Sequence, residues 1–230
     1  MARTASLNRR TFVAGATTAV VLGAAGTGAA LADGAADAAV AEPAETLTCD
    51  VVVVGAGISG LAAAVQAAQD GLNVVVLEKA DTAGGNGNGV EGIFAVGSTI
   101  QQSLGIEIEP SDILKSELEG AQYRVDASLW LNMIGNSAEN FSWLENNGPL
   151  YMARMCFMFV AIDGGIPTNV RAEALDDDLR AIPGLYAVGL DGAMMWRNIY
   201  TQDIPGTMMG HNVNSGRNAA RAAGAYIAGL

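Results

Sequence analysis

The 230-residue sequence contains one histidine, two cysteines and only 12 basic residues against 24 acidic ones, so its formal net charge is −12. Two cysteines cannot form a disulfide framework, and a single histidine leaves no Cys/His cluster, so we predict no metal site. The shortage of basic residues argues against a nucleic-acid partner and against binding to an anionic membrane surface. What the chain does contain, 50% hydrophobic residues and 29 glycines, suits a buried core joined by tight turns.

The first 32 residues have the pattern of an export signal. The pair Arg9-Arg10 precedes a charge-free stretch over 11–32, which ends in the small-residue site Ala30-Leu31-Ala32. We expect a Tat-type signal peptide over 1–32, cleavage after Ala32, an acidic Ala-rich linker over 33–48, and an extracytoplasmic or cell-envelope location. The protein would then meet the membrane only during export. The alternative is a membrane anchor, because 22 uncharged residues are long enough to span a bilayer.

A dinucleotide-binding pattern follows the linker. Residues 49–54 form a β-branched run, which predicts a parallel strand buried on both faces. The run leads into the sequence GAGISG over 55–60, a helical pattern over 61–70 and a second strand over 73–77. In such a unit the glycines make the turn, let the backbone approach a pyrophosphate, and let the helix pack closely on the strand. We therefore predict that five residues hold the diphosphate at the start of the helix: Gly55, Ala56, Gly57, Ser59 and Gly60.

An acidic residue follows the second strand. Glu78 lies 18 residues beyond Gly60, where a carboxylate accepts hydrogen bonds from the hydroxyls of a ribose. A carboxylate at this position disfavours a ribose that carries a 2′-phosphate, so we do not expect NADP. The pattern alone does not separate FAD from NAD.

Several further segments resemble the flavoprotein family of fumarate reductase and succinate dehydrogenase. They are Gly84-Gly85-Asn86, the Gly-rich stretch 92–98, GGIPT over 164–168, IPGLYAVG over 182–189, and PGTMMG over 205–210, which runs into an Ala-rich helix ending near Ile227. The resemblance implies noncovalently bound FAD in an α/β, Rossmann-like domain over 49–230, with a parallel central sheet that is incomplete relative to the family. It also implies that the N-terminus of the last helix faces the flavin, and that further cofactor contacts come from Lys79, Gly85, Asn86, Gly92, Gly189, Leu190, Thr207, Met208 and Met209.

The same resemblance implies hydride transfer between the flavin and an activated carbon–carbon bond, with a small-molecule substrate or electron acceptor and a separate electron-transfer partner. Two positions depart from the family. Ala161 stands where fumarate reductases have a substrate-binding histidine, and Asp203 stands where they have an arginine that clamps a carboxylate. Fumarate is therefore a poor candidate for the substrate.

The last segment also resembles 3-oxosteroid dehydrogenases, which implies that Tyr200 is a proton donor or acceptor beside the flavin. The alternative for Tyr200 is a half-buried aromatic ring with a satisfied hydroxyl group. His211 follows the expected flavin contacts by one helical turn, so it either takes part in the chemistry or packs locally. Trp196 is expected in the core.

The chain is much shorter than familiar family members. A helix is predicted over 126–147, with Leu129, Met133, Phe141 and Leu144 facing inward, and the segment 149–163 is interpreted as a deletion junction at which the family's cap domain is missing. Two alternatives to an active reductase remain open besides the steroid dehydrogenase. One is a degenerate FAD-binding fragment without turnover, and the other is an NAD-dependent dehydrogenase.

Overall fold

The computed structural model describes residues 46–89, 92–147, 164–197, 199 and 204–230, together with the backbone of two short strands, β1 (Phe12–Gly15) and β2 (Thr18–Val21). The two strands pair with each other in antiparallel fashion. The predicted cleavage site, most of the linker and the predicted junction over 149–163 lie outside the described residues.

An α/β unit opens the main body of the structure. Strand β3 (Val51–Val54), helix α1 (Ile58–Gln69) and strand β4 (Val74–Leu77) follow one another, and the two strands are parallel, with Val51 opposite Val74. The predicted strand, turn, helix and strand are therefore confirmed. Helix α1 covers one face of the sheet, where Val53 packs against Ala63 and Ala64.

The prediction that the first strand is buried on both faces is wrong. Val54 is 70% exposed, and within the strand only Val53 is buried. The reason is that β3 and β4 make a two-stranded sheet in the described part of the chain, with a helix on one face only.

Four helical segments follow: a 3₁₀ turn over Gly85–Gly89, α2 (Thr99–Ser103), α3 (Pro110–Gly120) and α4 (Ala127–Asn146). Asp126 caps α4, since its carboxylate accepts hydrogen bonds from the backbone N–H groups of Ser128 and Leu129. The helix predicted over 126–147 is thus confirmed, and Leu129, Met133 and Phe141 are buried as expected, whereas Leu144 is only half-buried. The main core lies here and includes Trp130 and, as predicted, Trp196.

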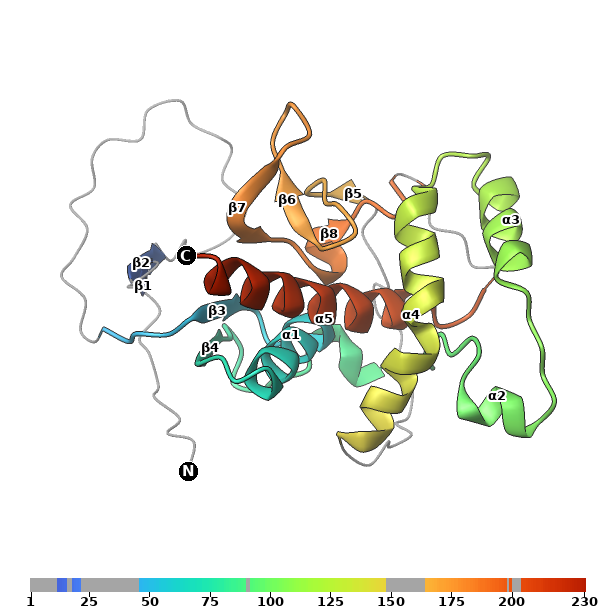
Figure 1. Cartoon of the computed structure of the whole chain (residues 1–230), viewed down its shortest axis with the longest axis horizontal. Coiled ribbons are helices and arrows are strands. Elements are labelled where there is room, and N and C mark those ends of the chain that lie inside the picture. The colour runs from blue at the N-terminus through green and yellow to red at the C-terminus, as the bar shows by residue number, and fades with distance from the viewer. Residues whose placement is uncertain are drawn as a thin grey trace.

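The C-terminal segment returns to the α/β unit through short strands. These are β5 (Gly164–Gly165), β6 (Glu173–Leu175), β7 (Ala181–Tyr186) and β8 (Gly192–Ala193), with a 3₁₀ turn over Gly189–Asp191. Strands β5 and β8 pair with each other, as do β6 and β7, both pairs antiparallel. Helix α5 (Thr207–Ala228) then runs across the middle of the molecule, between these strands and the β3–α1–β4 unit (Figure 1).

Helix α5 packs against α1 through small residues. A Cβ atom at Gly216 would lie 2.2 Å from the backbone oxygen of Ser59, so only glycine allows this close approach. Ala219, Ala220 and Ala223 are buried along the same helix. The small residues of the Ala-rich helix expected from the sequence therefore allow close packing against another helix.

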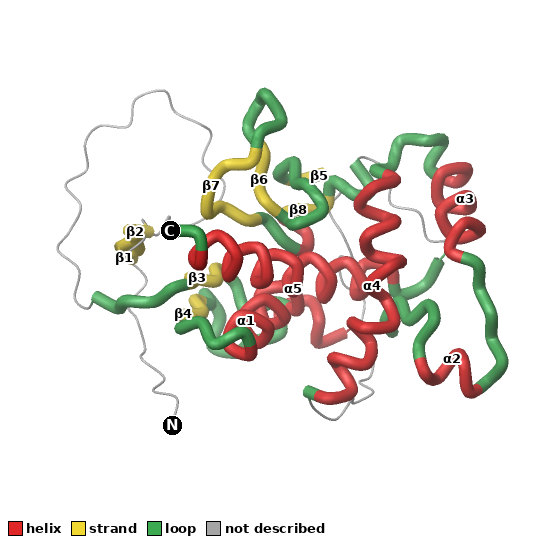
Figure 2. The backbone as a smooth tube through the Cα atoms, viewed as in Figure 1, coloured by secondary structure: helices red, strands yellow, loops and turns green. Residues whose placement is uncertain are grey.

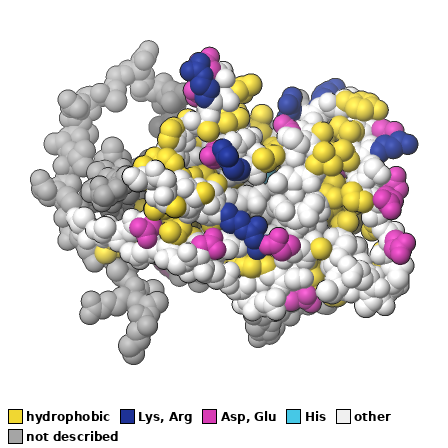
Figure 3. Space-filling view, viewed as in Figure 1, with side chains coloured by type: hydrophobic (Ala, Val, Ile, Leu, Met, Phe, Trp, Pro, Cys, Tyr) yellow, Lys and Arg dark blue, Asp and Glu magenta, His cyan; other side chains and the backbone are white. Residues whose placement is uncertain are grey.

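The arrangement of the other helices is clear in the backbone tube, where α4 crosses the N-terminal half of α5, and α2 and α3 lie beyond α4 (Figure 2). Acidic and basic side chains are interspersed over the face shown in Figure 3. In the described part of the chain, no helix combines the length and apolar character that crossing a bilayer requires.

Candidate dinucleotide site

The turn between β3 and α1 has the geometry that a dinucleotide needs. Gly55 adopts φ of +95°, which favours glycine, and a Cβ at Gly60 would lie 1.9 Å from the backbone oxygen of Gly55. A Cβ at Gly57, by contrast, would meet no atom within 4 Å. Two of the glycines therefore shape the turn and its packing, and Gly57 leaves open space beside it.

The N-terminus of α1 presents its backbone amides at this open space. Gly57 is the N-cap, and no side chain caps the helix. The first N–H groups of a helix have no partner within the helix, and they carry a partial positive charge. The turn is thus suited to an anionic diphosphate.

Glu78 lies at the carboxyl end of β4 and is bonded to the turn itself. Its Oε2 accepts a hydrogen bond from the Ala56 N–H at 2.7 Å, and its Oε1 accepts one from the Ala80 N–H at 2.8 Å. Both hydrogen bonds lower the pKa of Glu78 and keep it ionised, and the bond from Ala80 has the larger effect. The side chain is exposed, and a carboxylate with two bonds keeps further acceptor positions for ribose hydroxyls.

The second Gly-rich segment packs directly beside the turn. The Gly84 N–H donates to the Ala56 carbonyl oxygen at 2.7 Å, and a Cβ at Gly85 would lie 3.5 Å from the Gly57 Cα. Lys79 and Asn86 are exposed near it, and Gly92 begins the next described segment. The structure therefore brings Gly85 to the turn, as its predicted role requires.

Gly189 brings the C-terminal segment to the start of α1. It adopts φ of +60°, and a Cβ there would lie 2.3 Å from Ser59 Oγ. Two residues of α5 hold its backbone: Ser215 Oγ accepts from the Gly189 N–H at 3.0 Å, and His211 Nε2 lies 3.0 Å from the Gly189 oxygen. Ser59 and Gly189 are thus neighbours, although 130 positions separate them.

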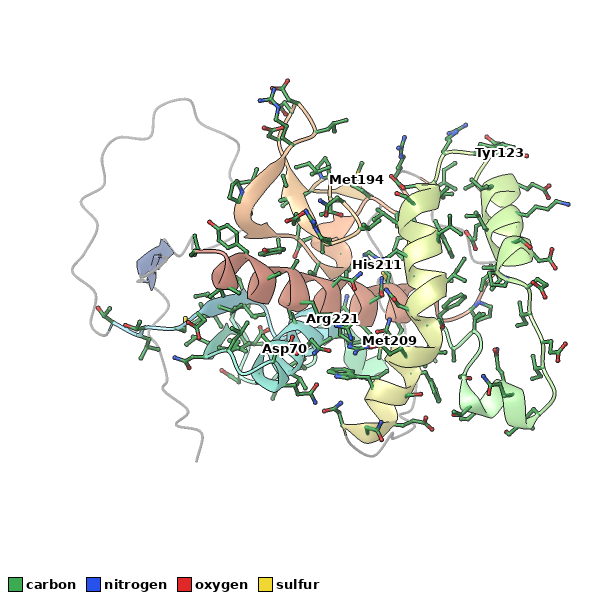
Figure 4. The ribbon with its side chains drawn as sticks, viewed as in Figure 1. Asp70, Tyr123, Met194, Met209, His211 and Arg221 are labelled. Carbon is green, nitrogen blue, oxygen red and sulfur yellow. The ribbon has the colours of Figure 1, made fainter. Side chains whose placement is uncertain are left out.

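His211 is buried and held by packing. Its ring stands edge-on to that of Trp196, with centroids 5.2 Å apart, and burial lowers its pKa to about 4. It is therefore neutral near pH 7, and its hydrogen-bond partners are the backbones of Gly189 and Gly192. In Figure 4, His211 and Met209 lie on opposite sides of α5. The observed contacts of His211 support local packing over a part in the chemistry.

The first turn of α5 lies against the segment that begins at Gly92. The Phe94 N–H donates to the Gly206 carbonyl oxygen at 3.0 Å, and Gly206 has φ of +79°. Thr207 begins the helix and is almost completely buried, yet its Oγ1 has no hydrogen-bond partner among the described residues. Met208 and Met209 follow it.

A groove of about 440 Å³ adjoins this end of α5. Its walls come from residues 93–96, from Gln101 of α2, from α3 and its preceding loop, and from Ile204 and Pro205. Most of the lining is apolar, while Asp112 adds a carboxylate to it.

Several predicted positions lie outside the described residues. These are the candidate catalytic residue Tyr200 and the two positions that depart from the family, Ala161 and Asp203. The structure leaves their predicted roles as predictions. Leu190, the neighbour of Gly189, belongs to the described 3₁₀ turn and packs against the main core.

Sequence reasoning missed a polar cluster that joins three helices. Arg217 is buried, and its guanidinium group donates to Gln66 of α1 and to Asn140 and Glu139 of α4. Burial lowers the pKa of Arg217. The pKa of Glu139 is also lowered, mainly by the hydrogen bond that Arg221 donates to it and to a smaller extent by the one from Arg217. The sequence contains no local signal for this cluster, because its partners come from segments up to 151 positions apart.

Comparisons with known proteins agree with this geometry. The FAD binding domain family matches residues 50–164, which is half of the chain. The vinyl phenol reductase of Lactiplantibacillus plantarum is 42% identical over 102 residues, which make up 44% of this chain and 21% of that protein. The NADH:fumarate oxidoreductase of Klebsiella pneumoniae is 34% identical over 100 residues, or 43% of this chain and 11% of that protein.

A third relative is a KsdD-like steroid dehydrogenase of Mycobacterium tuberculosis. It is 33% identical over 121 residues, which make up 49% of this chain and 21% of the dehydrogenase. The chain thus spans about a fifth or less of the length of these relatives.

The described residues fit FAD. The open space at Gly57, the uncapped amides of α1 and the position of Glu78 suit an adenosine diphosphate, as argued above. Thr207 lies at the start of α5, which the family resemblance implies to face the flavin. The cofactor would therefore be held by residues of the β3–α1–β4 unit and by residues at the start of α5.

Proposed function

We propose a function for this chain from the premise that it belongs to the FAD binding domain family, whose match covers half of its length. The proposed function is that of an exported FAD-dependent oxidoreductase that transfers hydride between the flavin and an activated carbon–carbon bond. Bound FAD supplies the hydride-transfer chemistry. The observation that carries the proposal is the contact of Gly189 with Ser59 of α1 and with Asn212 of α5, beside the uncapped start of α1.

The chain's own residues would bind and orient the cofactor. The amides of α1 bind the diphosphate, Glu78 binds the adenosine ribose, and the first turn of α5 presents N–H groups to the flavin ring. Tyr200 is the proposed proton donor or acceptor for the substrate.

The proposed substrate is an uncharged activated alkene. Asp112 lies in the groove beside α5, and a carboxylate repels a dicarboxylate such as fumarate. The Asp203 position supports the same choice, because the sequence has an acid there where fumarate reductases have a cation. Among the relatives, the vinyl phenol reductase is named for an uncharged substrate of this kind.

The test uses the purified full chain with a chemically reduced dye as electron donor. The proposal expects a yellow protein that releases FAD on denaturation and reduces 4-vinylphenol faster than fumarate. It expects Tyr200→Phe to lower turnover while FAD affinity stays the same. Faster reduction of fumarate would overturn the choice of substrate, and a colourless protein that does not take up FAD would overturn the function.

A second candidate function is FAD binding without turnover. It is favoured by the exposure of Val54 in a two-stranded sheet, because parallel sheets in α/β enzymes are covered on both faces. FAD retention with no reduction of either substrate, or of a 3-oxosteroid, would favour this candidate. If the chain is an active oxidoreductase, its proposed physiological partner is a separate electron-transfer protein.

Export by the Tat route is proposed from the sequence pattern at Arg9-Arg10. Cell fractionation should find the mature chain outside the cytoplasm, and replacement of both arginines by lysine should retain it inside. If the unaltered chain and the double-lysine variant were distributed equally between the cytoplasm and the outside, the proposal of Tat export would be contradicted.

A further inference from the structure

We infer that the groove beside α5 binds the substrate through a hydroxyl group, which Asp112 and Ser116 of α3 recognise. The inference rests on the function proposed above and deepens it, because it narrows the substrate to an uncharged, mainly apolar molecule that carries an alcohol or phenol group. It adds Ser116, which no sequence motif marks, to the residues that determine specificity.

The groove is a concave surface made mainly of hydrophobic side chains. Its volume of about 440 Å³ falls within the range of roughly 300–1,000 Å³ that is usual for small-molecule sites. Two of its lining residues, Phe94 and Ile113, belong to the buried main core, and Ile204 packs against the same core. The shape of the apolar lining is therefore fixed by core packing before a ligand binds.

Two polar side chains of the lining lie close together on α3. Asp112 and Ser116 are four residues apart, a spacing that places side chains on one face of a helix with Cβ atoms about 5–6 Å apart. Neither side chain has a hydrogen-bond or ion-pair partner among the described residues. Gln101 differs, because its Oε1 accepts from the Gly97 N–H at 2.9 Å. Since Asp112 and Ser116 are both exposed, a ligand in the groove has room to reach them.

A hydroxyl group is the ligand group that fits this pair of side chains. A carboxylate only accepts hydrogen bonds, whereas a serine hydroxyl both donates and accepts. A ligand hydroxyl donates its hydrogen to Asp112 and accepts the hydrogen of Ser116, so one group satisfies both residues. An ammonium group offers no acceptor to Ser116 and loses more hydration in an apolar groove, and a ligand carboxylate is repelled by Asp112.

The place of the pair in the groove also sets the direction of the ligand. Asp112 and Ser116 belong to α3, whereas Ile204 and Pro205 line the groove immediately before Gly206, the N-cap of α5. The start of α5 is the part that the family resemblance implies to face the flavin. A bound substrate therefore holds its hydroxyl group at α3 and directs its apolar part, with the double bond, toward α5.

The experiment measures binding with probes that differ in one group. 4-Ethylphenol and ethylbenzene differ only in the hydroxyl group, and neither has an alkene to reduce, so calorimetric titration of the purified full chain measures their affinities without turnover. The unaltered chain should bind 4-ethylphenol roughly 3–10-fold more tightly than ethylbenzene. A third probe, 4-ethylbenzylamine, is positively charged near pH 7 and should bind more weakly than 4-ethylphenol.

Substitutions on α3 assign the selectivity to the two side chains. Asp112→Leu and Ser116→Ala should each bring the affinity ratio of 4-ethylphenol to ethylbenzene closer to one, and Asp112→Leu should do so more because it removes the charged acceptor. Since the ratio is measured within one variant, a loss of folded protein does not change it. Ser111→Ala is the matched control, because Ser111 belongs to α3 but does not line the groove. It should leave the ratio unchanged.

If Asp112→Leu does not fold, Asp112→Asn takes its place, and its ratio should lie between that of the unaltered chain and one, because the amide oxygen still accepts. Equal affinities for 4-ethylphenol and ethylbenzene in the unaltered chain, or no binding of either, would overturn the inference. Tighter binding of 4-ethylbenzylamine would show a cation site instead. An unchanged ratio in both the Asp112 and the Ser116 variants would place the hydroxyl elsewhere.

These failures are distinguishable from a failure of the proposed function. A chain that binds 4-ethylphenol with the expected ratio but does not reduce 4-vinylphenol contradicts the function and leaves the hydroxyl site standing. A chain that reduces 4-vinylphenol and styrene equally well, and binds 4-ethylphenol and ethylbenzene equally well, supports the function and contradicts the hydroxyl site.

Discussion

The β3–α1 unit and the α3–α4 region are built from different kinds of residue. The first packs Val53 against Ala63 and Ala64, and it relies on glycine for its turns and close approaches. The second buries large side chains, among them Trp130, Met133 and Trp196. Because buried apolar area is the main source of folding free energy, the α3–α4 region should carry most of the stability. The β3–α1 unit leaves space at its backbone for a ligand, and part of its stability should come from that ligand.

The largest expected effect tests the stability of the α3–α4 region. Met133→Ala should lower the free energy of unfolding by about 2–5 kcal/mol, because it leaves a cavity in a closely packed core. Urea titration measures the loss. The control is Leu131→Ala on the same helix, where the side chain is 51% exposed and the change should stay within about 0.5 kcal/mol. If both variants lost the same free energy of unfolding, the packed core would not be the main source of stability in the α3–α4 region.

The next effect tests a glycine that packs against the β3–α1 unit, at the contact of Gly189 with Ser59. Gly189→Ala should cost about 1–2 kcal/mol from its left-handed backbone alone, and the new methyl group would also displace Ser59. FAD affinity should fall with it. Gly135→Ala on α4 is the matched control, since a Cβ there meets no atom within 4 Å, and alanine in a helix should add up to about 1 kcal/mol. Opposite signs for the two substitutions, measured by thermal unfolding, are the expected result.

A third effect concerns the junction of the two regions, where His211 is the only histidine in the chain. Its folded pKa of about 4 lies below the ordinary 6.5, so below that pH the unfolded state binds the additional proton. Its contribution to stability is complete above 6.5 and falls by roughly 1 kcal/mol per pH unit as the pH drops from 6.5 to about 4. His211→Gln should remove this dependence, which urea titrations at several pH values would detect.

The smallest effect on stability is expected at Glu78. Its folded pKa is lowered below 4.5, so its contribution is present above that pH and is lost as the pH falls through the lowered value. Glu78→Gln should therefore be less stable than the wild type near pH 7, and the difference should shrink in acid. The same variant should bind both FAD and ADP more weakly. Glu107→Gln serves as the control, and an identical effect there would remove the assigned role of Glu78.

The elements around the turn were predictable from the sequence because their signals are local. The run of valines and the spacing of Gly55, Gly57 and Gly60 fix a strand, a turn and a helix start within ten residues. The exposure of Val54 was not predictable from that pattern, since it depends on which neighbours cover the sheet. The Arg217 cluster and the groove beside α5 were missed for the same reason: each depends on contacts between segments far apart in the chain.

The contact of Gly216 with Ser59 has a consequence for how the protein is made. These residues are 157 positions apart, so at about 5–20 residues per second the ribosome needs roughly 8–30 s to add the second after the first. During that interval the glycine-rich turn lacks its contact with α5, because this helix has not yet been synthesised. The dinucleotide site is therefore complete only after the last helix has been synthesised.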